Sequence, residues 1–153
     1  MATQVYVVSG SLGHGERSHA NGNAYQDGEI FDSEHASEAE IAQLVSQGVL
    51  VTPQRHAQME AAYTIGGSTD VEAVLTRLRG LQQGHLQSAI RLTEEMMDPR
   101  GRIEREGHHD VGRLLQQIRG ERDSQLQAAD KYAAQIAEIE AAGAAPVSAG
   151  GEA

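Results

Sequence analysis

Two long amphipathic segments, 70–98 and 110–142, constrain the fold of this chain more than any other feature. A short stretch that contains Pro99 and Gly101 separates them. In the second segment apolar residues recur at alternating steps of four and three, which is the period of one face of an α-helix. Because such a narrow stripe needs a partner, the pattern predicts two long helices that pack as an antiparallel hairpin.

The stripes also identify the side chains that we expect at the packing seam or at an interface between copies of the chain. These interface residues are Val71, Leu78, Leu81, Val111, Leu115, Ile118, Tyr132, Ile136 and Ile139. Arg122 and Gln125 interrupt the second stripe, and polar residues at a seam can set register or oligomeric state, or mark where a partner helix ends. His85 lies in register with the first stripe, which favours a hydrogen-bonded histidine over a catalytic base.

Local signals mark the ends of the two segments. The run from Thr69 to Glu72 has the pattern of a capping box, which predicts a helix start. Asp98 precedes a proline, and a residue in that position is disfavoured in helical geometry, so the first helix should end there. Asp110 is a suitable N-cap for the second helix.

The first 53 residues predict a small β unit with one short helix. Ser37 and Glu40 form a second capping box, and Gly48 is suited to the left-handed position that ends a helix. The polar, glycine-rich stretch 10–23 predicts a loop, and its glycine spacing matches no phosphate-binding fingerprint. The predicted strands are 4–8, 29–31 and 49–53.

Together these patterns predict an α+β fold in which a small N-terminal β unit precedes a long α-helical hairpin. The stretch 54–67 contains Gly66 and Gly67 and is interpreted as a linker with a short helical or extended segment. The Ala- and Gly-rich end lacks apolar periodicity and predicts a flexible tail. The predicted divisions are a β unit at 1–53, a linker at 54–67, a hairpin at 68–142 and a tail at 143–153.

Composition narrows the possible functions. The net charge is -10, which disfavours binding to the phosphate backbone of nucleic acids. No apolar run is long enough to span a bilayer, so no membrane role is expected. The chain has no cysteine, hence no disulfide or thiolate metal site, and its one Phe and absence of Trp leave little to fill a thick core. Homo-oligomerisation would bury apolar surface that such a thin core cannot bury.

Candidate chemistry is sparse. The densest histidine cluster is His108, His109 and Asp110 with Glu104 and Glu106, but neighbouring residues on a helix point about 100° apart and do not share one ion easily. We interpret this cluster as a solvated loop and expect no metal, no cofactor and no enzymatic activity. The paired acidic residues are interpreted as solvated faces, because acid and base catalysis needs a concave, partly dry site. They are Glu94 and Glu95, Asp98, Glu104 and Glu106, and Glu138 and Glu140.

The N-terminal order of elements resembles a family of small β domains. A strand at Val5 to Val8, a Gly-containing loop, the run Gly28 to Phe31 and the run Leu44 to Pro53 are similar to N-terminal β domains common in tailed-phage proteins encoded among head and tail genes. The resemblance covers residues 5–53. It implies a non-enzymatic virion structural protein made in the host cytoplasm.

Combined with the helical seam, the resemblance favours an accessory head protein that decorates or cements the capsid. Its expected partners are further copies of itself and capsid or other virion proteins. Three alternatives remain open. They are a head-to-tail adaptor or tail component, a cytoplasmic coiled-coil adaptor or scaffolding chaperone, and a small metal-dependent enzyme that would use the cluster at His108 to Asp110.

Overall fold

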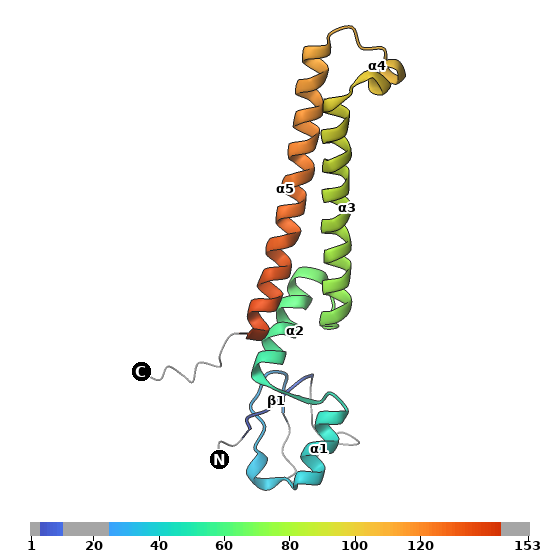
Figure 1. Cartoon of the computed structure of the whole chain (residues 1–153). Coiled ribbons are helices and arrows are strands. Elements are labelled where there is room, and N and C mark those ends of the chain that lie inside the picture. Colours follow the sequence, from blue (N-terminus) through green and yellow to red (C-terminus); the bar gives the residue numbers. More distant parts are fainter. Residues whose placement is uncertain (1–3, 11–24, 145–153) are drawn as a thin grey trace, which may run out of the picture. The chain divides into compact units, whose positions relative to one another are not determined.

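The computed structural model describes residues 4–10 and 25–144 (Figure 1). These residues are mostly helical. In chain order they form β1 (Val7–Val8), the 3-10 helix η2 (Ser33–His35), α1 (Glu38–Ser46), β2 (Leu50–Val51), α2 (Pro53–Gly66), α3 (Val71–Met97), α4 (Arg100–Glu106) and α5 (Val111–Ala144). They group into two compact units, which are the N-terminal unit, made of the described residues of 1–69 with 140–144, and the helical unit, Asp70–Ile139.

The β structure of the N-terminal unit is smaller than predicted. β1 and β2 pair antiparallel with Val7 opposite Val51 and Val8 opposite Leu50. The predicted strand 29–31 is a single bridge from Ile30 to Val7. A helix begins at Pro53, two residues after Val51, and this limits β2 at its C-terminal end. The prediction of an α+β fold was therefore wrong in the size of its β part.

A compact apolar cluster holds the sheet and its neighbouring segments together. Val8, Tyr25, Phe31 and Leu50 are buried, and the rings of Tyr25 and Phe31 lie with centroids 5.3 Å apart. The Tyr25 hydroxyl accepts a hydrogen bond of 3.1 Å from the Asp32 amide. This cluster places the turn before Glu29 beside β1, where the Gly28 amide donates to the Val8 carbonyl at 2.8 Å.

Helix α1 has the predicted ends. The Ser37 hydroxyl accepts from the Glu40 amide at 3.1 Å, which satisfies one of the free amides of the first turn. Gly48 adopts a φ of +76° directly after the helix, as the sequence predicted for its C′ position.

The predicted linker is a helix. α2 begins where Thr52 accepts a hydrogen bond from the Arg55 amide at 3.1 Å and Pro53 occupies the first turn. A proline in that position loses no helical hydrogen bond, so it starts α2 as well as ending β2. Gly67 then ends α2 in the left-handed conformation with a φ of +74°. Of the two conformations expected for 54–67, the helical one is therefore correct, and the segment belongs to the N-terminal unit.

Most of the predicted ends of the long helices are confirmed. α3 ends at Met97, and Asp110 caps α5 by accepting a hydrogen bond of 3.1 Å from the Arg113 amide. The N-cap of α3 is Asp70, one residue after the predicted Thr69, and its carboxylate accepts from the Ala73 amide at 3.1 Å. Helical geometry continues to Ala144, so Gly143 and Ala144 do not belong to a flexible tail. The rest of the predicted tail and most of the predicted loop 10–23 lie outside the described residues.

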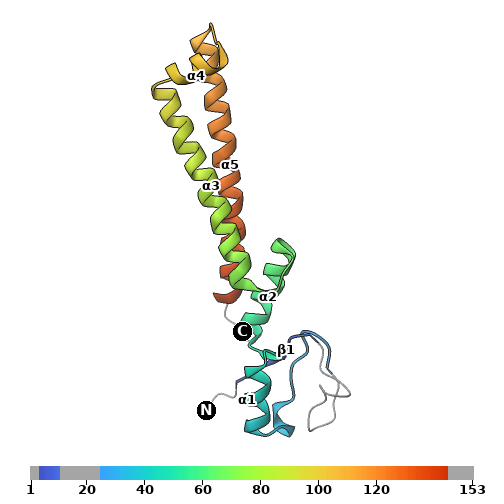
Figure 2. The ribbon, with the colours of Figure 1, turned by 90° about the vertical axis from the view of Figure 1, so that its right-hand side faces the viewer.

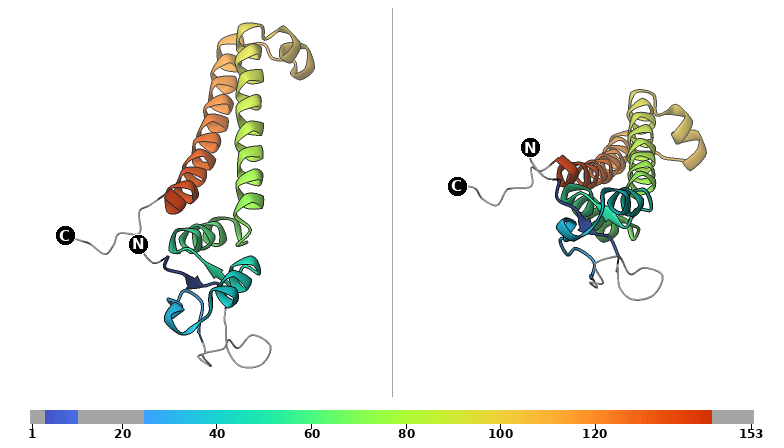
Figure 3. Two further views of the ribbon diagram at one scale, coloured as in Figure 1. Left: turned by 60° about the horizontal axis from the view of Figure 1, so that its bottom comes forward. Right: turned by 90° about the horizontal axis from the view of Figure 1, so that it is seen from below.

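The helical unit contains three helices. α3 and α5 run side by side (Figures 1 and 2), and α4 forms in the connection between them, for which the sequence predicted no helix. Figure 3 shows α4 set to one side of this pair. Leu92 of α3, Leu114 and Ile118 of α5 and Ile103 of α4 belong to one apolar cluster, which ties the three helices together. Among the described helices, none is long and apolar enough to span a membrane.

Candidate functional site

The predicted interface residues do not share one degree of burial. Val71, Leu78, Ile118, Ile136 and Ile139 are buried. Leu115 and Tyr132 are half-buried, whereas Leu81 and Val111 are exposed. Val111 is the first residue of α5, and the adjacent buried position is Leu114, which the predicted stripe omitted. The stripe therefore describes packing inside the helical unit for some residues and leaves others on the surface.

His85 and Gln125 are paired across the helical unit. The Nδ1 of His85 lies 2.7 Å from the Oε1 of Gln125, and the imidazole stacks on the Tyr132 ring with centroids 5.6 Å apart. Since an amide oxygen only accepts, Nδ1 carries the proton in this arrangement. The expectation of a hydrogen-bonded histidine is confirmed, and the polar interruption at Gln125 is satisfied by α3 of the same chain.

The strongest electrostatic feature of the helical unit is centred on Arg102 of α4. Its guanidinium binds Glu121 of α5 with two hydrogen bonds of 2.8 Å and Glu95 of α3 with one of 3.1 Å. Its Nε donates to Glu106 at 3.0 Å. The side chain of Arg102 is only 10% exposed, so it links α3, α4 and α5 through charge-assisted bonds.

Hydrogen bonds in the same network lower the pKa values of two of its carboxylates. The hydrogen bond from Arg102 lowers the pKa of Glu121, and the hydrogen bond from His108 followed by that from Arg102 lowers the pKa of Glu106. Both groups are held as anions, which disfavours their use as general acids at neutral pH. Interpreting Glu95 as a solvated residue was wrong, because it is half-buried against Arg102.

The histidine cluster near the start of α5 does not form a metal site in the described structure. His108 Nε2 pairs with Glu106, but Asp110 is used to cap α5. No group of three potential ligands in the described part of the chain includes His108, His109 or Asp110. The objection from helical spacing does not apply, because these residues lie between α4 and α5; His108 and Asp110 are instead engaged with different partners.

An apolar groove runs along the α3–α5 pair. It has a volume of about 360 Å³ and is lined by Leu86, Ala89, Ile90, Thr93 and Glu94 of α3 and by Arg122 and Leu126 of α5. Ile90 is 60% exposed and Leu126 is 40% exposed. Met97, on the same side of α3 by helical phase, is 83% exposed. Exposed apolar side chains that gather along one face are typical of a binding face.

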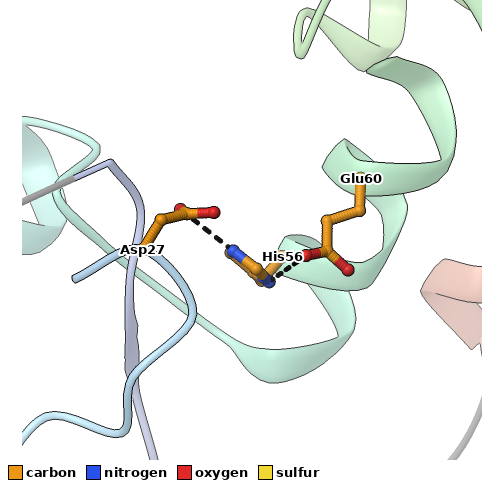
Figure 4. A group of neighbouring side chains, drawn as sticks. All are labelled: Asp27, His56 and Glu60. Atoms are coloured by element: carbon orange, nitrogen blue, oxygen red, sulfur yellow. Dashed lines mark hydrogen bonds and ion pairs between the residues drawn. The ribbon is translucent and has the colours of Figure 1, made fainter. Parts of the chain in front are cut away.

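The N-terminal unit carries a cluster that the sequence analysis did not identify. Asp27, His56 and Glu60 are the one group of three His, Asp or Glu residues in the described structure whose potential ligand atoms lie within 4.8 Å of one another (Figure 4). The Nε2 of His56 is 3.1 Å from Asp27 Oδ1, and its Nδ1 is 3.8 Å from Glu60 Oε1. Spacing of four between His56 and Glu60 would have signalled one face of a helix, had 54–67 been interpreted as helical throughout.

Comparison with known proteins assigns no function to any of these features. No protein-family model, curated protein or solved structure matches the chain.

Proposed function

We propose that the protein is a non-enzymatic structural protein that works as a homo-oligomer, with the helical hairpin of α3 and α5 as its assembly element. The observation that carries this proposal is the apolar groove with Ile90 and Leu126 on its surface. Apolar side chains gain free energy when they leave water, at about 25 cal/mol per Å² of buried area. A second copy offers the same apolar groove as a partner surface.

One buried cluster of the helical unit is small. Leu92, Leu114 and Ile118 form it, with Met96 and Ile103 packed against them. Small units bury a small fraction of their surface and gain stability from association. The two long helices thus have a physical reason to pack on further helices.

Charges at the groove also suit pairing between identical copies. Glu94 and Arg122 line the groove on different helices. In a two-fold symmetric contact, any pairing of residue i with residue j occurs twice, so Glu94 of each copy can face Arg122 of the other. Opposite charges at the rim favour the correct register and speed up association.

We further propose that the oligomer is an accessory head protein of a tailed phage, which binds capsid or other virion proteins. The support for this finer role is the resemblance of residues 5–53 to N-terminal domains of tailed-phage proteins. A head-to-tail adaptor would share the resemblance and the assembly face, and a scaffolding chaperone would share the assembly face alone.

Disrupting the groove should separate the copies without unfolding them. We expect the full chain to sediment as an oligomer at micromolar concentration, and Ile90→Asp and Leu126→Asp to sediment as monomers, because a carboxylate opposes burial of the face. Gln127→Asp is the matched control, since it adds the same charge at an exposed neighbouring position on α5. A monomeric wild-type chain, or variants that sediment like the wild type, would contradict the assembly proposal.

The virion role predicts where the protein is found. Quantitative mass spectrometry of purified particles from the source should detect the chain at a fixed ratio to the major capsid protein. A ratio of a few copies per particle would favour the adaptor or tail component. Abundance in the host cell with absence from particles would contradict the virion role and favour the scaffolding chaperone.

A further inference from the structure

We propose that Asp27, His56 and Glu60 form a binding site for a divalent transition-metal ion such as Zn²⁺. The three side chains come from two separate parts of the N-terminal unit, the turn before Glu29 and helix α2 (Figure 4). The site lies outside the α3–α5 assembly face, so it does not depend on the proposed structural function.

Local structure positions two of the three ligands. The start of α2 is set by the Thr52 cap and Pro53, which places His56 on the second turn of the helix. Asp27 is held by the Gly10 amide, which donates to its Oδ1 at 2.8 Å. The His56 side chain is 13% exposed, so its ring is largely enclosed by the protein. Ligands that are oriented by other protein groups bind metal more tightly than free ones.

Gly28 allows the turn to approach the imidazole. A Cβ atom added to Gly28 would lie 3.4 Å from the Cε1 of His56, at the tight end of ordinary contact. The backbone of Gly28 also has a φ of +87°, which side-chain-bearing residues rarely adopt. The turn therefore packs directly on the ring and keeps Asp27 beside His56.

Charge and ligand chemistry favour a transition metal. Two carboxylates and one neutral imidazole offset the charge of a dication. Imidazole suits Zn²⁺, Cu²⁺ or Ni²⁺, whereas Mg²⁺ and Ca²⁺ prefer oxygen ligands alone.

The cluster must close around the ion. Its potential ligand atoms lie within 4.8 Å of one another, whereas zinc bonds of about 2.1 Å place tetrahedral ligands roughly 3.4 Å apart. Asp27 lies at the Nε2 of His56 and Glu60 at its Nδ1, and one ring nitrogen binds one ion, so Glu60 must move to the Nε2 side. Its side chain is 66% exposed and has several rotatable bonds, which permit this movement. Three protein ligands leave a fourth position for water, as in open zinc sites.

Calorimetric titration of the full-length chain with ZnCl₂ tests the site. We expect one saturable site per chain, with the affinity reduced at least about tenfold in His56→Gln and in Glu60→Gln, because each variant loses a ligand. His109→Gln is the matched control, since it removes an exposed imidazole from the helical unit and should titrate like the wild type.

Thermal unfolding gives a second readout. Zn²⁺ should raise the unfolding midpoint of the wild type and of His109→Gln but not of His56→Gln, and a chelator should reverse the rise. If His56→Gln fails to fold, Glu60→Gln tests the site instead, because Glu60 is exposed and its replacement should leave the fold intact. Absence of saturable binding, or binding that survives both His56→Gln and Glu60→Gln, would overturn the proposal and leave the cluster as an ion pair between α2 and the turn.

Discussion

Ile118→Asp is expected to destabilise the protein by about 4 kcal/mol, which is enough to unfold many small domains. Ile118 is fully buried in the cluster with Leu92 and Leu114. The substitution removes apolar contacts and places a carboxylate where it has neither water nor a positive partner. Chemical denaturation followed by circular dichroism gives the free energy of unfolding directly.

Two further variants on α5 serve as comparisons for the stability of Ile118→Asp. Ile136→Asp, at the second buried position of the same stripe, should also lower stability by several kcal/mol. Glu138→Gln, on the exposed side of α5, should change it by no more than about 0.5 kcal/mol. Equal midpoints for all three variants would show that the periodicity of α5 does not describe its packing surface.

Arg102→Gln is expected to have the next largest effect. It leaves Glu95 and Glu121 facing each other without the guanidinium that now bridges three helices. We expect a loss of about 1–2 kcal/mol, below the cost of breaking a fully buried pair, because the carboxylates stay partly solvated. Arg100→Gln is the control, since its ion pair with Asp98 is exposed and should contribute little.

The loss of unfolding free energy in Arg102→Gln should depend on pH. Arg102 lowers the folded-state pKa of Glu121 below the unfolded value of 4.5. The unfolded chain therefore binds a proton before the folded chain does, and this stabilisation is present above pH 4.5 and disappears as pH falls through the lower folded-state pKa. The difference between wild type and variant should be largest near pH 7 and shrink in acid. A difference that is constant from pH 7 to about pH 3 would contradict this role of Glu121.

Nearby residues explain which parts of the fold were predictable. Ser37, Gly48 and Asp110 act on backbone groups within a few positions of themselves, so their capping roles follow from local sequence alone. Asp98 ended α3 as predicted because a proline follows it. Thr52 and Pro53 carried an equally local signal for α2, which was missed because the proline was interpreted only as the end of a strand.

The candidate sites depended on residues far apart in the chain. Asp27 and His56 are 29 positions apart, and Arg102 and Glu121 are 19 apart. Periodicity along each segment gives no information about such pairs, since it does not determine how one segment packs on another. The apolar groove could not be predicted for the same reason, because Leu86, Ile90 and Leu126 meet only when α3 and α5 lie side by side.

By itself the sequence determined that residues 71–97 and most of 111–144 are helical, where most of the ends of those helices lie, and some of the positions that are buried, because capping bonds and the 3.6-residue period act within a few turns. Only the tertiary structure decided that β1 and β2 shrink to two residues each, that Arg102 joins three helices, and that Asp27 meets His56 and Glu60. These outcomes arise from contacts between distant segments, whose geometry is set when the apolar faces pack together.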